Sequence, residues 1–188
     1  MDSNPEMIFV RPATFHDTLA LGLLIQEALP LSPSSVLNEG TVLQEAFLTG
    51  SEVLEGAMVG TEDLLIAEVD EEVAGLVLVK PKELVRSRHV ARLQLVVHPE
   101  APGQEVRVAL LRAALERSAE RALIKVVMDV AQPDRELQSL VEQDELWWTE
   151  RLRRGAVYWN GARIDVTTWA CWVKGPPGSG ETHAPGRS

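Results

Sequence analysis

Residues 97–111 read Val-His-Pro-Glu-Ala-Pro-Gly-Gln-Glu-Val-Arg-Val-Ala-Leu-Leu, and this stretch decides the fold. It begins at the end of an apolar run, residues 90–97, which is typical of a buried strand. Pro99 ends that run, and from Gly103 apolar residues recur at helical spacing, which predicts that a helix begins there. The first turn of a helix carries bare N–H groups and a partial positive charge, so this turn favours a bound anion.

The segments on either side predict the rest of the architecture. We expect strands at 7–11, 64–69, 73–79, 90–97, 122–130, 156–160 and 163–173, with hairpin turns at Asp70-Glu71-Glu72 and Asn160-Gly161. We expect helices at 17–29, within 36–47, at 103–121 and at 132–154, where the acidic stretch 142–145 interrupts the helical spacing. Thr14 and Asp17 have the spacing of a capping box before the first helix.

The order of these elements, together with the stretch 97–111, resembles the GNAT superfamily of acyl-CoA-dependent N-acetyltransferases over roughly residues 7–173. In that family a strand ends in Val-x-Pro, and the turn reads Gln/Arg-x-x-Gly-x-Gly/Ala before a helix. This chain keeps Val97-His98-Pro99 and Gly103, but Pro102, Glu105 and Arg107 occupy the three signature positions of the turn. The resemblance is therefore to a GNAT domain with a degenerate pyrophosphate loop. It implies an α/β (α+β) fold class: a mixed, mostly antiparallel central sheet of about six to seven strands flanked by about four helices.

The resemblance also implies acetyl-CoA as the cofactor, bound in a V-shaped slot where strands 90–97 and 122–130 splay apart. Pantetheine would pair with the backbone of Leu95, Val96 and Val97. The diphosphate would meet the start of the following helix, at Gly103, Gln104, Glu105, Val106, Arg107 and Val108.

Each altered position has a physical consequence for that loop. Pro102 has no N–H to donate. A Glu105 carboxylate about 4 Å from a phosphate would be repelled by roughly 1 kcal/mol in water, or about 4 kcal/mol near a protein surface. If the position required a positive φ, a residue other than Gly would add a penalty on the order of 1 kcal/mol. Arg107 points toward the slot, where it either binds phosphate or fills the space. The favoured interpretation is that its side chain runs along apolar surface, or pairs with Glu105 or with an acid of a neighbouring helix.

The sequence does not define the catalytic residues. The family often supplies a general acid as a Tyr four residues before a Gly-Phe pair; that pair is Gly155-Ala156 here, and the position holds Arg151. The family's frequent general base, a Glu three residues before the Val of Val-x-Pro, is replaced by Gln94, which cannot take a proton. Gln94 and His98 are the candidates that remain, although a solvent-exposed turn histidine is the favoured interpretation of His98.

Length and composition favour one domain. A chain of 188 residues with 45% hydrophobic content is long enough for a single core, which we place at 7–174. Residues 1–6 and the Gly/Pro/Ser-rich residues 175–188 are expected to be disordered. The one cysteine, Cys171, lies in an apolar stretch and is expected to be a packed thiol.

The net charge and the motifs of the sequence limit which partners are expected. A formal net charge of −10 disfavours nucleic acid and anionic membranes, and it favours a small-molecule amine or a basic peptide as substrate. The four histidines are scattered without metal-ligand spacing, so no metal is expected. No leader or membrane-length apolar run is seen, which predicts a cytoplasmic location. The tryptophans near the C-terminus are expected to fill the core, or else to line a homodimer interface: Trp147, Trp148, Trp159, Trp169 and Trp172.

The sequence thus predicts a GNAT-like N-acetyltransferase that transfers an acyl group from acetyl-CoA to an unidentified primary amine. The alternative is a non-catalytic GNAT-fold binding or dimerisation module that has lost efficient acyl-CoA binding.

Overall fold

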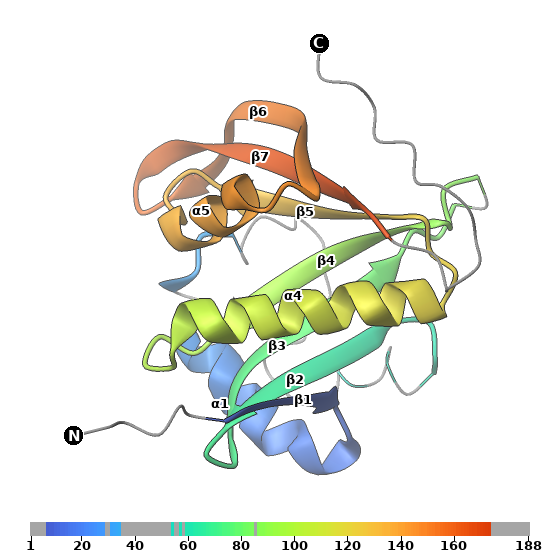
Figure 1. The fold of residues 1–188 in the computed structure, drawn as a ribbon. Helices are drawn as coiled ribbons and strands as arrows, with labels where there is room; N and C mark the ends of the chain where they lie inside the picture. The colour runs from blue at the N-terminus through green and yellow to red at the C-terminus, as the bar shows by residue number, and fades with distance from the viewer. Residues whose placement is uncertain are drawn as a thin grey trace.

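A seven-stranded sheet forms the centre of the protein in its computed structural model, which describes residues 7–28, 31–34, 54, 57, 59–84 and 86–173. The strand order is β1-β2-β3-β4-β5-β7-β6. Every neighbouring pair is antiparallel except β4 and β5, which are parallel (Figure 1). The strands are β1 (Ile8–Pro12), β2 (Asp63–Val69), β3 (Glu72–Pro81), β4 (Val90–Val97), β5 (Lys125–Ala131), β6 (Trp147–Trp159) and β7 (Ala162–Trp172). The predicted mixed, mostly antiparallel sheet is confirmed.

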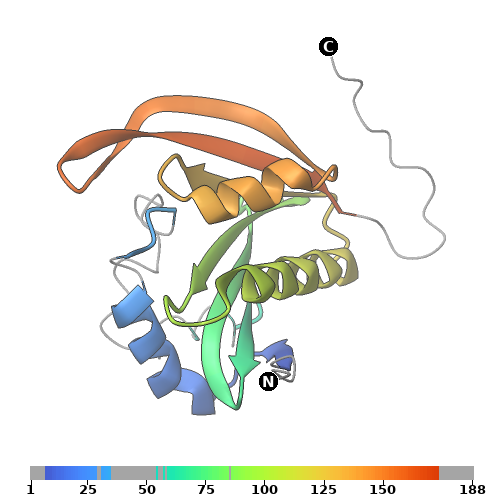
Figure 2. The same ribbon diagram turned by 60° about the vertical axis from the view of Figure 1, so that its left-hand side comes forward.

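Helices pack on both faces of this sheet, as Figures 1 and 2 show. On one face α1 (Thr18–Ala28) buries Leu21 and Ile25 against alternate side chains of β2, β3 and β4. On the other face, α4 (Gly103–Glu120) and α5 (Arg135–Gln143) cover the remaining side chains of the sheet. Three of the expected helices are therefore present, and the helix expected within 36–47 lies outside the described residues.

Both predicted hairpin turns are confirmed by their backbone angles. Asp70 and Glu71 connect β2 to β3 with φ values of 50° and 69°. Asn160 and Gly161 connect β6 to β7 with φ values of 47° and 81°. Two consecutive residues in the left-handed region make a type I′ turn, whose twist matches that of the flanking strands.

The helix expected at 132–154 is wrong beyond Gln143. The chain becomes extended at Asp144 and then forms β6, in which Trp147 lies opposite Cys171 of β7. Pairing with β7 satisfies the backbone of this aromatic-rich segment, and it overrides a helical spacing that the acidic stretch had already interrupted. Gly155 does not end a helix either: it lies inside β6 with φ 55°, where the register with β7 shifts.

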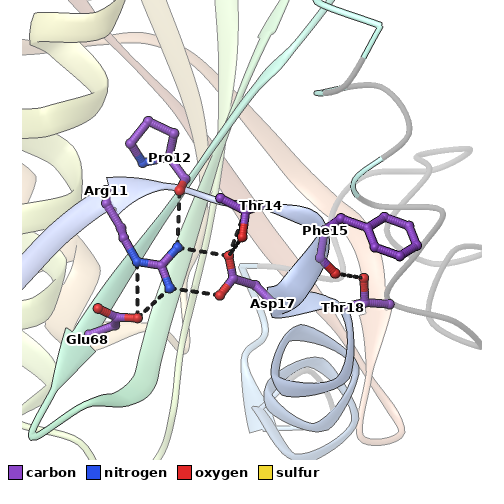
Figure 3. Close-up of polar contacts among 7 residues, drawn as sticks. All are labelled: Arg11, Pro12, Thr14, Phe15, Asp17, Thr18 and Glu68. Atoms are coloured by element: carbon purple, nitrogen blue, oxygen red, sulfur yellow. Dashed lines mark hydrogen bonds and ion pairs between the residues drawn. The ribbon is translucent and has the colours of Figure 1, made fainter.

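An ion-pair cluster joins β1 to β2 and to the turn before α1, as Figure 3 shows. Arg11 of β1 donates to both carboxylate oxygens of Asp17, at 2.8 and 2.7 Å, and also to Glu68 of β2. The backbone N–H of Thr14 donates to the same Asp17 carboxylate at 2.6 Å, as the predicted capping box requires. These hydrogen bonds lower the pKa of Asp17 well below its ordinary value, and those from Arg11 are the largest cause.

Candidate functional site

The β4–β5 ladder ends halfway along both strands. It runs from the pair Val90–Lys125 to the pair Leu93–Met128. Beyond this point β4 continues its pairing with β3 as far as Val97, while β5 continues its pairing with β7 as far as Ala131. The two strands are thus drawn toward opposite halves of the sheet, and a gap opens between them where the sequence predicted a slot.

The turn after β4 places the start of α4 at the open end of this gap. The N–H of His98 donates to the carbonyl of Ala74 at 2.8 Å, which holds the turn on β3. Pro102 is the N-cap, and the N–H of Val106 donates to its carbonyl at 3.1 Å. The bare N–H groups of the first turn are therefore those of Gly103, Gln104 and Glu105.

The expected strain at Glu105 is absent. Glu105 lies in the first turn of α4 and is not among the described residues with positive φ. Its side chain is exposed, so the carboxylate has room to turn into solvent. Of the two penalties predicted for this substitution, the backbone penalty does not apply, and water screens most of the charge repulsion.

Arg107 lies across the start of its own helix. A Cβ added to Gly103 would stand 2.7 Å from Arg107 Nη1, so the guanidinium rests against the backbone of that glycine. Nη1 also donates to Glu136 Oε2 of α5 at 2.5 Å, and the Arg107 side chain is 18% exposed. The interpretation of Arg107 as a partner of an acid in a neighbouring helix is confirmed, and the guanidinium also faces the slot.

A cavity of about 420 Å³ occupies the open end of the gap. Its wall includes the end of β4, the start of α4 and the start of α5, and it takes in Val97, His98, Gly103, Arg107 and Glu136. Residues 31–33 close another side. A volume of this size lies in the range of small-molecule sites.

The sequence did not reveal the contributions of Ser34 and Glu136 to this region. The hydroxyl of Ser34, which is buried, accepts a hydrogen bond at 3.1 Å from the N–H of Ala131 at the end of β5. Glu136 is separated from Arg107 by 29 residues. Contacts across such distances leave no local pattern in a sequence, so only the fold brings these residues together.

His98 is bound within the site and is not a free turn side chain. The N–H of Glu100 donates to Nδ1 at 3.2 Å, which places the ring proton of a neutral imidazole on Nε2. Nε2 lies 2.8 Å from Glu27 Oε2 of α1, and the side chain is 24% exposed. The histidine therefore connects the turn to α1, and its side chain is only part-exposed to solvent.

Gln94 lies at the apex of the gap. It is the first residue of β4 after the last β4–β5 pair, it is 3% exposed, and its side chain shares the α1 face with those of Leu78 and Val96. Among the residues that the structure describes, neither Oε1 nor Nε2 has a hydrogen-bond partner. A buried amide without partners is destabilising, and a catalytic or binding role is one reason for which such a group is kept.

The other sequence-derived positions contribute less. Leu95 and Val96 are buried in β4, while the side chains of Gln104 and Val108 are exposed on α4. Arg151, reached by counting back along an expected helix, lies on β6 instead, so the family's helical position for a general acid has no counterpart there.

A second cavity of about 440 Å³ lies on the other side of His98, between α1 and the β2–β3 hairpin. Four carboxylates contribute to its lining, those of Glu27, Asp70, Glu72 and Glu100. None of its lining residues belongs to β4, to β5 or to the segment that follows β5, whereas the first cavity is lined by Val97 of β4 and by residues 133–136, so the second cavity does not open from the gap between β4 and β5.

Solved structures resemble this chain over nearly its whole length. An acetyltransferase of the GNAT family from Streptococcus pneumoniae superposes with a TM-score of 0.70 at 17% identity, covering 89% of this chain and all of the other. YncA, a putative acetyltransferase from Salmonella typhimurium solved with its cofactor acetyl-CoA, gives 0.75 at 15% identity, covering 97% and 99%. A chimera of the spermidine N-acetyltransferase SpeG from Vibrio cholerae with hSSAT gives 0.66 at 19% identity, covering 88% and 95%.

These likenesses define the class of fold: the chain has the fold of the GNAT acetyltransferases. No family model matches the sequence, and no curated protein matches it. None of the described helices is long and apolar enough to cross a membrane. Among the described residues, no group of three or more His, Cys, Asp or Glu side chains is arranged to hold a metal ion.

Proposed function

We propose that this protein is an N-acetyltransferase that uses acetyl-CoA to acetylate a primary amine. The observation that carries the proposal is the ending of the β4–β5 ladder at Leu93–Met128, with a cavity of about 420 Å³ and the start of α4 at the open end. The likeness to YncA, which was solved with acetyl-CoA, supports the same cofactor here.

The residues present fit a diphosphate at the cavity mouth. The N–H groups of Gly103, Gln104 and Glu105 lie at the positive end of an 18-residue helix. Pro102 supplies no donor, and we assign the missing donors to Arg107, whose guanidinium rests against Gly103. A guanidinium binds phosphate through two parallel hydrogen bonds, which makes it an adequate replacement.

The strand edge fits the pantetheine arm. The backbone of Leu95, Val96 and Val97 borders the gap, and the family likeness suggests that it pairs with the pantetheine amides. The side chain of Val106 is buried beneath this region and supports the turn, while that of Val108 is exposed on α4.

Acetyl-CoA would supply an activated thioester, and the chain would position the amine against it. The amine nitrogen forms a bond to the carbonyl carbon, the C–S bond breaks, and the amine proton balances the thiolate that leaves. We place the reacting carbon beside Gln94, whose Oε1 would accept a hydrogen bond from the amine. Gln94 orients the nucleophile but takes no proton, so the amine must arrive in its neutral form.

A second function remains in view because Gln94 replaces a carboxylate and Arg107 already has a partner in Glu136. Under that alternative, the protein keeps the fold as a binding or dimerisation module without acyl transfer. The two proposals differ in one measurable property, the affinity for acetyl-CoA.

Calorimetric titration with acetyl-CoA tests the proposal. We expect a dissociation constant in the micromolar range, and release of free CoA thiol when a panel of primary amines is added. The Glu136→Gln variant is titrated in parallel, because it removes the charged partner of Arg107 and keeps a side chain of similar size in the cavity wall. If neither protein binds acetyl-CoA at millimolar concentration, the enzyme proposal is wrong and the binding-module alternative stands.

A further inference from the structure

Two surfaces of opposite charge lie at opposite ends of β3. One is the second cavity, hereafter the acidic cavity, which adjoins the β2–β3 hairpin at the start of β3. The other is the basic turn, residues 82–89, which follows the end of the strand at Pro81. The ten residues of β3 span about 30 Å, so the two surfaces lie too far apart to contact each other within one molecule.

Three carboxylates at the rim of the acidic cavity have no charged partner among the described residues. They are exposed, and no hydrogen bond or ion pair joins their side chains to the part of the chain that the structure describes: Asp70, Glu72 and Glu100. The fourth carboxylate, Glu27, pairs with His98 at 2.8 Å. Like charges held close together repel, so a cationic group that enters the cavity is stabilised by all three.

Apolar surface continues from this cavity along the outside of α1. Leu24 contributes to the cavity wall, and Leu23 lines the same wall with 52% of its surface exposed. Leu19, one helical turn before Leu23, is 75% exposed. The acidic cavity therefore offers apolar contacts as well as negative charge, and an apolar centre with a polar rim is the composition of a protein interface.

The basic turn has the complementary composition. Its cationic side chains are exposed, and none of them is joined by a hydrogen bond or an ion pair to a described residue: Lys82, Arg86 and Arg88. Glu83 is the only acid of residues 82–89. Leu84 is 76% exposed, and Ile124, which is 53% exposed, donates its N–H to the carbonyl of His89 at 2.8 Å. Apolar side chains are thus bordered by positive charge on this surface.

Backbone hydrogen bonds support the basic turn. The N–H of Lys82 donates to the carbonyl of Val90 at 2.9 Å, and the N–H of Val90 donates to the carbonyl of Ser87 at 2.9 Å. The N–H of Ser87 donates to the carbonyl of Leu84 at 2.8 Å. A turn that is ordered before binding loses less conformational entropy when it docks, which favours its use as a contact surface.

We infer that copies of this protein associate head to tail, with the basic turn of one copy docked in the acidic cavity of the next. Leu84 would contact Leu23 and Leu24, and the flanking cations would face the rim carboxylates. A two-fold dimer through either surface would place like charges opposite each other, so the contact joins unlike surfaces. Because every pair leaves one turn and one cavity unoccupied, the assembly grows into a ring or a filament. The inference stands apart from the proposed function, because no step of it involves acetyl-CoA.

Sedimentation equilibrium over a range of protein concentrations tests the inference. We expect the weight-average mass to rise past that of a dimer at low salt, and to fall toward that of a monomer at high salt as the charges are screened. A monomer at every concentration, or a mass that stops at a dimer, would overturn the inference. If pentalysine binds such a monomer, the cavity serves a basic segment of another protein instead.

Two variants that each lose one surface give a sharper test. The turn variant, Arg86→Gln with Arg88→Gln, keeps the acidic cavity, and the cavity variant, Asp70→Asn with Glu72→Gln, keeps the basic turn. Asn is tolerated at position 70, where φ is 50°. Each variant alone should associate at least tenfold more weakly than the natural protein. An equimolar mixture should form a 1:1 pair and nothing larger, because only one natural interface is left.

Matched variants outside the two surfaces are the controls. Glu71→Asn removes an acid of the same hairpin that does not line the cavity, and Arg112→Gln with Arg163→Gln removes two exposed arginines elsewhere. These proteins should assemble as the natural protein does. Controls that dissociate as readily as the turn and cavity variants would show that net charge alone governs association, and a mixture without the 1:1 pair would contradict the docking.

Discussion

Arg107 Nη1 and Glu136 Oε2 are 2.5 Å apart, so one ion pair joins α4 to α5 at the cavity mouth. Under the proposed function, the Glu136 carboxylate occupies the place on the guanidinium that a diphosphate oxygen would take. Glu136 is 66% exposed, and water therefore weakens this pair. A ligand with two phosphate charges can displace such a partner.

Removal of the competing carboxylate should strengthen cofactor binding. We expect Glu136→Gln to lower the dissociation constant of acetyl-CoA by about threefold to tenfold, since one repulsive charge is lost near the site. Arg107→Ala should raise it at least tenfold. Titration calorimetry at low and high salt measures both effects, and the difference between the variants should shrink as salt screens the charges.

Arg112→Ala provides the control for these variants, because Arg112 is an exposed arginine on the same helix. It should bind acetyl-CoA as the natural protein does. Equal affinities of Arg107→Ala and Arg112→Ala would show that Arg107 does not contact the cofactor.

Gln94→Leu should separate stability from activity. The substitution removes two buried polar atoms that have no hydrogen-bond partner in the described part of the chain, so the free energy of unfolding should rise by about 1 kcal/mol. The same variant should lose at least tenfold in kcat/KM, with the affinity for acetyl-CoA unchanged. Urea unfolding and a thiol-release assay measure the two properties. A fully active Gln94→Leu protein would rule out a role for this amide, and Gln143→Leu on the surface of α5 serves as control.

The Arg11–Asp17 ion pair predicts a pH-dependent contribution to stability. The pKa of Asp17 is lowered in the folded protein, so folding favours the charged carboxylate. This contribution is complete above the unfolded carboxyl pKa near 4, decreases as the pH falls below it, and is lost only as the pH falls through the lowered folded pKa. Asp17→Asn should therefore reduce the free energy of unfolding by about 2 kcal/mol at pH 7 and by less at pH 2.5.

Urea unfolding at the two pH values tests this, with Glu72→Gln at an exposed position as the control. A loss for Asp17→Asn that is the same at both pH values would contradict the assignment. It would show that the side chain stabilises the turn without its charge.

Gly75 allows α4 to pack closely on β3 because it has no side chain. A Cβ at this position would stand 3.0 Å from Leu110 Cδ1, from Val106 Cγ1 and from the carbonyl oxygen of Val96. We expect Gly75→Ala to destabilise the fold by about 1–3 kcal/mol because of this crowding. In a double-mutant cycle, adding Val106→Ala should recover part of the loss. Strict additivity of the two losses would mean that the extra methyl group is accommodated elsewhere.

Local signals predicted most of the fold. The Asn160-Gly161 turn and the break before Gly103 are each determined by the conformations that a few consecutive residues permit. The strand β6 was missed because its extended state depends on pairing with β7, which follows it in the chain. The apolar residues Leu140, Val141 and Leu152 recur at helical spacing, so this pattern predicted a helix and did not indicate the pairing with β7.

The candidate site was predictable only in part. The altered positions of the loop pointed to Arg107, and the family resemblance pointed to Gln94. Both could be found because the motif around Val97-His98-Pro99 fixes their positions in the sequence. Glu136 and Ser34 could not be found this way, because their partners lie 29 and 97 residues away. Their roles depend on which strand edges the fold brings together.

The short ladder between β4 and β5 divides the sheet mechanically. Four backbone rungs, from Val90 to Leu93 on β4, join the β1–β4 half to the β5–β7–β6 half. Each half is held by longer ladders, with seven pairs between β3 and β4 and seven between β5 and β7. Any widening of the gap for an incoming molecule would therefore strain the four β4–β5 pairs before it disturbed the pairing within either half.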